Sequence, residues 1–183
     1  MKLKKQHANF LARKITKDLI NSEFIELRKD RMAIIEECER ILLEDIEKEI
    51  KLDEQVNIIL ENMEDDIQFY NADFKQLFWM TKKRLANEFD VNLNFEDRFS
   101  NIAHNIMDFL YEEDFIHFTV TDNQVKNLIA NAINAFIKGY DEADGLAYEK
   151  IRNYKRKLIP GTEDYDLIFK RLYEEELIKK GLL

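Results

Sequence analysis

The sequence predicts an all-α protein made of two tandem copies of one helical module. Apolar residues recur at helical spacing along most of the chain, which has only four glycines and one proline for tight turns. The stretch at 9–27 also recurs at 100–118, an offset of 91 residues. Its matched apolar positions follow i, i+4 and i+8, which is typical of one face of a helix. A repeat of about 90 residues is far longer than a solenoid repeat, so it indicates two modules.

The same offset holds through four segments without an insertion, which indicates a duplication. We therefore divide the chain into module one, residues 1–91, and module two, residues 92–183. The matched pairs are Ala12/Ala103, Ile15/Ile106, Leu19/Leu110, Phe24/Phe115, Ile25/Ile116, Ile34/Val125, Cys38/Ile129, Leu42/Ile133, Ile46/Ile137, Asp73/Asp164, Phe74/Tyr165, Leu77/Ile168 and Phe78/Phe169.

Each module is expected to contain about four helices. Module one should hold, in order, a helix at 3–21, an extended segment at 24–27, a helix at 31–50 capped by Asp30, a helix capped by Asp53, an acidic loop at 64–66, and a helix to about residue 88 capped by Asn71. Module two should hold a helix capped by Asn94, an extended segment at 115–120, a helix from the Thr121–Gln124 capping box to Tyr140, a break at Asp144-Gly145 before a further helix, and a last helix capped by Thr162 and closed by Gly181.

The two extended segments occupy equivalent places in the modules. An unpaired strand edge is a liability in a folded protein. We therefore predict that 24–27 and 115–120 pair as a short two-stranded ribbon between the modules.

The charge is unevenly distributed along the chain. Residues 1–35 carry nine basic and four acidic side chains, whereas residues 36–73 carry fourteen acidic and three basic ones. We interpret this polarity as two segments that neutralise each other across a helix pair. The formal net charge of −9 disfavours general nucleic-acid binding, which needs a basic face.

The single cysteine and the hydropathy indicate a cytoplasmic protein. Cys38 lies on an apolar stripe and has no second cysteine to pair with, so we interpret it as a core residue in a reducing compartment. The first residues lack an apolar secretory segment, and the apolar runs are too short to span a bilayer. No membrane association is expected.

The sequence offers little for catalysis or cofactor binding. It has neither a nucleophile motif nor a glycine-rich phosphate loop. His104 and Asp108 lie four residues apart, as either a weak ion site or a solvated pair. Neither a cofactor nor a metal is predicted, and the protein is expected not to be an enzyme. An enzyme with an acidic site would require a deep pocket where several carboxylates converge.

A basic stretch interleaved with aromatic residues is the best candidate for anion or RNA contact. It consists of Lys150, Arg152, Lys155, Arg156 and Lys157, with Tyr148 and Tyr154 between them. The alternative interpretation, which we favour from sequence, is that these cations serve the end of their own helix and nearby acids.

A further stretch, Phe78-Trp79-Met80, widens the apolar face of its helix in module one only. Its counterparts at the same offset are Phe169, Lys170 and Arg171. A widened face is expected to be buried against something, preferably the other module and otherwise a separate partner.

The final stretch resembles a bacterial family catalogued as domain of unknown function 507. The resemblance is carried by Arg156-Lys157-Leu158-Ile159-Pro160-Gly161-Thr162, Tyr165-Asp166-Leu167-Ile168-Phe169, Tyr173-Glu174-Glu175-Glu176 and Lys179-Lys180-Gly181, together with the Met1-Lys2-Leu3 start. It implies the same fold over the whole chain and no assigned activity. Module one departs from the pattern, because no Pro-Gly-Thr precedes Phe74 and Lys82-Lys83-Arg84 replaces the Tyr-Glu-Glu-Glu run.

These patterns favour a monomeric, non-catalytic interaction or scaffolding protein of the bacterial cytoplasm, acting through exposed helical faces. The residues expected to bind an unknown protein partner are Trp79, Met80, Tyr173, Glu174 and Glu175. The alternative is association with RNA or the ribosome through the basic stretch at 148–157.

Overall fold

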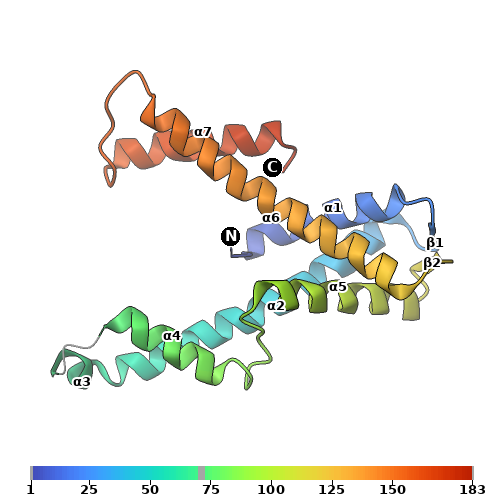
Figure 1. Cartoon of the computed structure of the whole chain (residues 1–183), viewed down its shortest axis with the longest axis horizontal. Coiled ribbons are helices and arrows are strands. Elements are labelled where there is room, and N and C mark those ends of the chain that lie inside the picture. The colour runs from blue at the N-terminus through green and yellow to red at the C-terminus, as the bar shows by residue number, and fades with distance from the viewer. Residues whose placement is uncertain (1, 70–72, 183) are drawn as a thin grey trace.

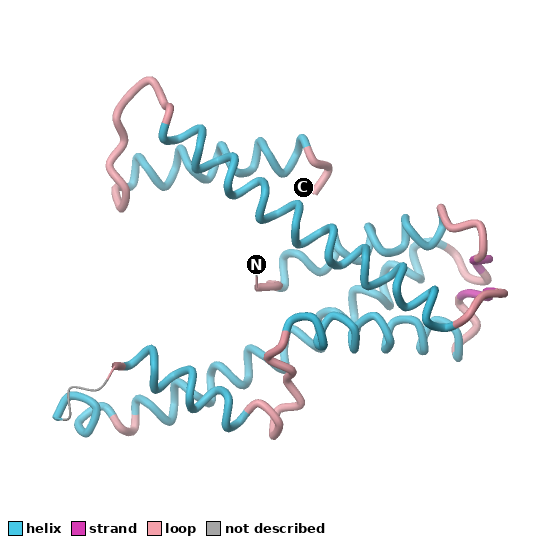
Figure 2. Tube along the Cα trace, viewed as in Figure 1, coloured by secondary structure: helices cyan, strands magenta, loops and turns pink. Residues whose placement is uncertain are grey.

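The chain folds into a central helical bundle from which two arms diverge (Figures 1 and 2). The computed structural model describes residues 2–69 and 73–182. In this part the elements are α1 (Lys5–Ile20), β1 (Ile25–Leu27), α2 (Arg31–Glu61), α3 (Glu64–Phe69), α4 (Phe74–Leu85), α5 (Phe95–Glu112), β2 (Ile116–Phe118), α6 (Asp122–Arg152) and α7 (Glu163–Lys179). The predicted all-α class is confirmed. None of these helices is long and apolar enough to cross a membrane.

The two repeats are related by a pseudo-two-fold arrangement. Helices α2 and α6 have 31 residues each, and their ends lie 91 positions apart. Strands β1 and β2 are antiparallel, and Glu26 lies opposite His117, its own counterpart at that offset. The predicted ribbon between the modules is therefore confirmed.

One hydrophobic core is shared by both repeats. Helix α1 packs on α2 and α6, and α5 packs on α6 and α2. The fully buried side chains at its centre come from both halves and include Leu11, Ile15, Leu42, Ile106 and Phe136. The matched apolar positions of the two repeats thus pack into the same core.

Each arm is the second half of a long helix, covered by a shorter one. In the first arm α4 packs on α2, and the buried residues are Leu52, Val56, Leu60, Leu85, Ala86 and Val91. In the second arm α7 packs on α6, and the buried residues are Ala147, Ile151 and Leu172. Figure 1 shows the two arms leaving the bundle on the side opposite the ribbon.

The two predicted breaks within the long helices are wrong. Helix α2 runs through Asp53, and α6 runs through Asp144 and Gly145, so the described part of module two has three helices and not four. Asp53 does not cap a helix, because its carboxylate pairs with Lys2 and Lys82. Glycine lowers helix stability by only about 1 kcal/mol, and the buried Ala143 and Ala147 on either side of Gly145 hold the helix in place.

Most of the predicted helix ends are confirmed. Asp30, Asn94 and Thr162 each accept a hydrogen bond from a backbone N–H in the first turn of their helix, and Thr121 with Gln124 forms a capping box. Gly181 follows α7 with φ +66°, and its counterpart Asp90 has φ +53°. The acidic stretch 64–66 was expected to form a loop, but it begins α3. The predicted cap Asn71 lies outside the described residues, and Asp73 caps α4.

Truncating equivalent core residues should destabilise the whole fold. Ile15 and Ile106 are completely buried in the shared core. We expect Ile15→Ala and Ile106→Ala each to lower the free energy of unfolding by about 2–5 kcal/mol, because each leaves a cavity. Urea denaturation followed by circular dichroism measures the effect. Ile178→Ala is the control: that side chain is 61% exposed, so a loss as large as in the core variants would contradict the assignment.

Candidate functional site

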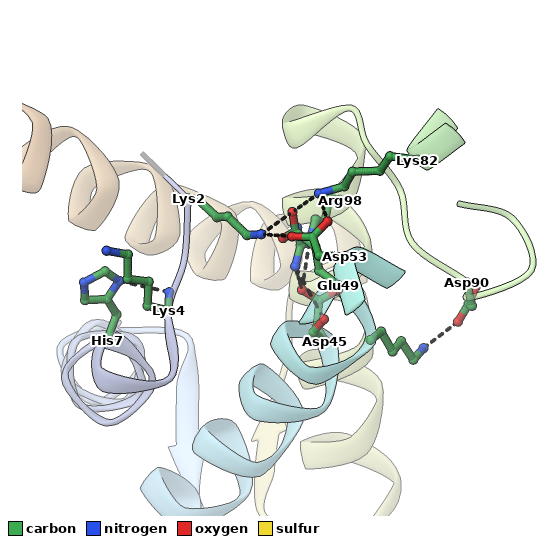
Figure 3. A network of polar contacts seen from close by, with 10 residues as sticks. Lys2, Lys4, His7, Asp45, Glu49, Asp53, Lys82, Asp90 and Arg98 are labelled. Carbon is green, nitrogen blue, oxygen red and sulfur yellow. Dashed lines mark hydrogen bonds and ion pairs between the residues drawn. The ribbon is translucent and has the colours of Figure 1, made fainter. Parts of the chain in front are cut away.

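A buried network of ion pairs lies where α2 leaves the central core (Figure 3). Glu49 of α2 accepts hydrogen bonds from Lys82 of α4, at 2.8 Å, and from Arg98 of α5. Arg98 also donates through Nε and Nη2 to Asp45 Oδ2, at 2.8 and 2.6 Å. All three central side chains are almost fully buried, with Glu49 5%, Lys82 3% and Arg98 4% exposed. We call the set Lys2, Asp45, Glu49, Asp53, Lys82 and Arg98 the ionic junction.

The charges of the ionic junction balance. The Nζ atom of Lys2 lies 3.0 Å from Glu49 Oε1 and 2.6 Å from Asp53 Oδ2, while Lys82 Nζ lies 2.6 Å from Asp53 Oδ1. Burial raises the pKa of Glu49, but the hydrogen bonds from Lys82 and Arg98 outweigh it and hold this pKa at about 2. Three carboxylates therefore face three basic side chains, and ion pairs hold the base of the first arm against α5 and the N-terminal segment.

The equivalent place in the second arm is aromatic. The His7 ring lies 4.8 Å from the Tyr140 ring, centroid to centroid, and the Tyr140 ring lies 6.5 Å from that of Tyr173. The Tyr140 hydroxyl donates to the carbonyl of Leu182 at 2.9 Å. We call the set His7, Phe136, Tyr140, Tyr173 and Leu182 the aromatic junction. At the 91-residue offset the two junctions correspond as Arg98 with His7, Asp45 with Phe136, Glu49 with Tyr140 and Lys82 with Tyr173, while the counterpart of Leu182 is Val91, in the apolar cluster of the first arm.

Trp79 and Met80 lie on the outward face of α4 and are 56% and 60% exposed. The expectation that this face is buried against the other module is wrong, because the arms diverge and α4 packs on α2 of its own repeat. Positions 76, 79, 80 and 83 form one helical stripe, with 75 and 84 at its margins. We call Lys75, Gln76, Trp79, Met80, Lys83 and Arg84 the α4 surface.

The other three residues expected to bind a partner lie in the second arm. Tyr173 is half-buried in the aromatic junction, where burial, followed by neighbouring Tyr140 and two aspartates, raises its pKa to about 12. Glu174 and Glu175 lie 4.0 and 3.8 Å from Lys170 and Arg171. The structure thus places these three on α7, apart from Trp79 and Met80 on α4.

The five cations of the basic stretch divide into two groups. Lys150 pairs with Glu176, and Arg156 pairs with Asp164. Arg152, Lys155 and Lys157 are exposed and form no ion pair with the residues that the structure describes. A hollow of about 530 Å³ opens beside them at the tip of the second arm.

The remaining polar residues include the His104–Asp108 pair and the single cysteine, Cys38. His104 and Asp108 form an exposed pair at 3.1 Å, and no three metal-ligating side chains converge among the residues at 2–69 and 73–182. Cys38 is buried, which raises the pKa of its thiol to about 12. The carboxylates that do converge, in the ionic junction, are bound to cations.

The geometry defines a duplicated, two-armed, all-α protein with unlike arm junctions and an outward Trp79–Met80 surface on the first arm. The chain belongs to the family described as "Protein of unknown function (DUF507)", whose model matches residues 1–182. The resemblance carried by the final stretch is therefore confirmed, and the family extends over both repeats. Comparison with curated proteins finds no match.

Sequence reasoning missed the ionic junction, although one residue pointed to it. Leu42, Ile46 and Glu49 follow the helical spacing of the buried stripe of α2, so Glu49 is a carboxylate at a core position. A buried carboxylate requires cationic partners. The spacing alone did not show that they come from α4, α5 and the N-terminal segment.

Glu49 should make stability depend on acidity in a defined window. Its pKa is about 2 in the folded chain and ordinarily about 4.5. A lowered folded-state pKa contributes stability above pH 4.5 that is lost as the pH falls towards 2. At neutral pH the unmodified chain should have a higher free energy of unfolding than the Glu49→Gln variant. We expect this difference to decrease by about 3 kcal/mol as the pH falls through this window. Urea denaturation at pH 7, 4 and 2.5 measures the difference.

The matched control for this experiment is Glu54→Gln. Glu54 is exposed on the same helix and forms no ion pair with the described residues. Its variant should track the unmodified chain at all three pH values. A stability gap for Glu49→Gln that stays constant with pH would contradict the charged state of Glu49.

Proposed function

We propose that the protein is a non-catalytic interaction protein of the bacterial cytoplasm that binds a protein partner through the α4 surface. The observation that carries the proposal is the exposure of Trp79 and Met80, side by side on the outward face of one helix. Exposed aromatic and Met side chains are the residue types that most often anchor protein interfaces. At the equivalent positions of α7 the chain has Lys170 and Arg171 instead.

The charges around these anchors favour an acidic partner. Lys75, Lys83 and Arg84 flank Trp79 and Met80, and none of the three forms an ion pair within the described residues. Apolar anchors at helical spacing with charged margins suit an amphipathic helix laid along the surface. The partner segment we propose is therefore a helix with an apolar face and acidic edges.

Trp79 also connects the α4 surface to the ionic junction. The Nζ atom of Lys82 lies 5.4 Å from the centroid of the Trp79 ring, and the same ammonium group is held by Glu49 and Asp53. A cation over an aromatic face is attracted to it. The ring is thus held in place before binding, which lowers the entropy lost when a partner covers it.

Two further observations support a proposal for the cellular location and the oligomeric state. Cys38 is the single cysteine and is a buried free thiol, which suits a reducing compartment. The internal pseudo-two-fold arrangement replaces the symmetry that a homodimer would supply. We therefore propose a cytoplasmic monomer.

Replacing the anchors should abolish partner capture. Immobilised protein is incubated with lysate of the native organism, and bound proteins are identified by mass spectrometry. We expect one or a few proteins to be retained by the unmodified chain and lost with Trp79→Ala/Met80→Ala, because truncating an interface anchor typically weakens binding by about 30-fold or more. The captured partner, once purified, should shift the Trp79 emission maximum to shorter wavelength.

The control is Leu167→Ala/Ile178→Ala. These residues are 62% and 61% exposed on α7, so this variant removes a similar amount of exposed apolar surface from the other arm. It should retain the same proteins. Equal loss in both variants, or retention by both, would overturn the assignment to the α4 surface.

A further inference from the structure

We propose that the tip of the second arm binds single-stranded nucleic acid, with one nucleotide seated in the hollow between the end of α6, the loop after it and the start of α7. This site uses other residues than the α4 surface and does not depend on it. The argument rests on unpaired charge, held aromatic rings and the dimensions of the hollow.

Three of the five cations at 150–157 have no ion-pair partner in the described part of the chain. Arg152 and Lys157 line the hollow, and Lys155 lines an adjoining one of about 650 Å³. None of these three forms an ion pair with any residue that the structure describes. On a chain of net charge −9, such a concentration of unneutralised cations marks a place for an anion.

Aromatic rings are presented beside these cations. Tyr148, which is 53% exposed, and Tyr165 both line the hollow. The ring of Phe169 packs against both, with its centroid 4.5 Å from that of Tyr148 and 6.3 Å from that of Tyr165. Rings held in this way offer faces on which a base can stack.

The lining offers groups that suit both the base and the phosphate of a nucleotide. Leu158 and Pro160 add apolar surface near the tyrosines, and Glu149 contributes a carboxylate. That carboxylate repels a phosphate but accepts hydrogen bonds from an exocyclic amino group of a base. The base should therefore lie towards Tyr148 and Glu149, with its phosphate at Arg152 and Lys157.

The dimensions favour a strand over a single nucleotide or a duplex. A hollow of about 530 Å³ is large enough for one base and its sugar. Lys155 lies at the neighbouring hollow, where it can meet the phosphate of the next nucleotide. Bases paired in a duplex cannot place their faces on the tyrosine rings. An acidic peptide would satisfy the cations but leave the rings unused.

Fluorescence anisotropy with labelled 12-nucleotide single strands, of RNA and of DNA, tests the proposal. We expect saturable binding. A plot of the logarithm of the association constant against the logarithm of the salt concentration should have a slope of about −2, since each of three phosphate contacts contributes about −0.7. The affinity should then drop roughly 20-fold between 50 and 200 mM salt. Tyr148→Leu should weaken binding about tenfold and leave the slope unchanged.

The decisive comparison uses two triple variants of equal charge. Arg152→Gln/Lys155→Gln/Lys157→Gln should abolish binding. Arg31→Gln/Lys17→Gln/Lys51→Gln, which removes one Arg and two Lys that are exposed and unpaired elsewhere in the described part, should retain it. The variant Trp79→Ala/Met80→Ala should also retain it, so failure of the α4 surface and failure of this site can be told apart.

Several results would overturn the proposal. Equal loss in both triple variants would mean that only overall charge matters. Equal affinity for a duplex of the same sequence, for a mononucleotide or for a peptide of glutamates would remove the single-stranded assignment. Circular dichroism of each variant checks that the fold is intact.

Discussion

The architecture depends on a mismatch of helix lengths within one shared core. Helices α2 and α6, with 31 residues each, are about 46 Å long, whereas α1 and α5, with 16 and 18 residues, reach only about 24–27 Å. The short helices cover only the first halves of the long ones. The second halves must bury their apolar stripes against something else, which the chain supplies as α4 and α7. The two arms therefore follow from the uncovered length.

The junctions at the base of the arms show how the duplicated halves diverged. In each case the first helix of one repeat meets the long helix and the arm of the other: α5 contributes Arg98 to the first arm, and α1 contributes His7 to the second. A buried ion network is not more stable than an apolar one of equal volume, but removing one partner from it is costly. The ionic junction therefore fixes the position of the first arm through a specific set of ion pairs. The aromatic junction fixes the position of the second arm through the packing of its rings.

Features that depend on local residue spacing were predicted correctly from the sequence. Features that depend on contacts between distant segments were not. Local sequence was enough to predict the caps at Asp30, Asn94 and Thr162, because each depends on a few neighbouring residues. The alignment of the two repeats was enough to predict the ribbon. The breaks at Asp53 and Gly145 were wrong, since a polar residue or a glycine ends a helix only when no tertiary contact continues it. The burial of Trp79 was wrong because nothing local shows that the arms diverge.

Divergence along the outer helices argues for unlike roles of the two arms. In α7, Lys170 and Arg171 occupy the positions that Trp79 and Met80 occupy in α4. Each of these cations lies near a glutamate one turn later, Glu174 or Glu175. The counterparts of these two glutamates in α4 are Lys83 and Arg84. The outward face of α7 is therefore neutralised within its own helix. The same positions of α4 carry apolar side chains beside cations that no acid in the described part neutralises. Because the two helices occupy equivalent places in one fold, packing within the chain does not require this difference, which is what a binding role confined to α4 would produce.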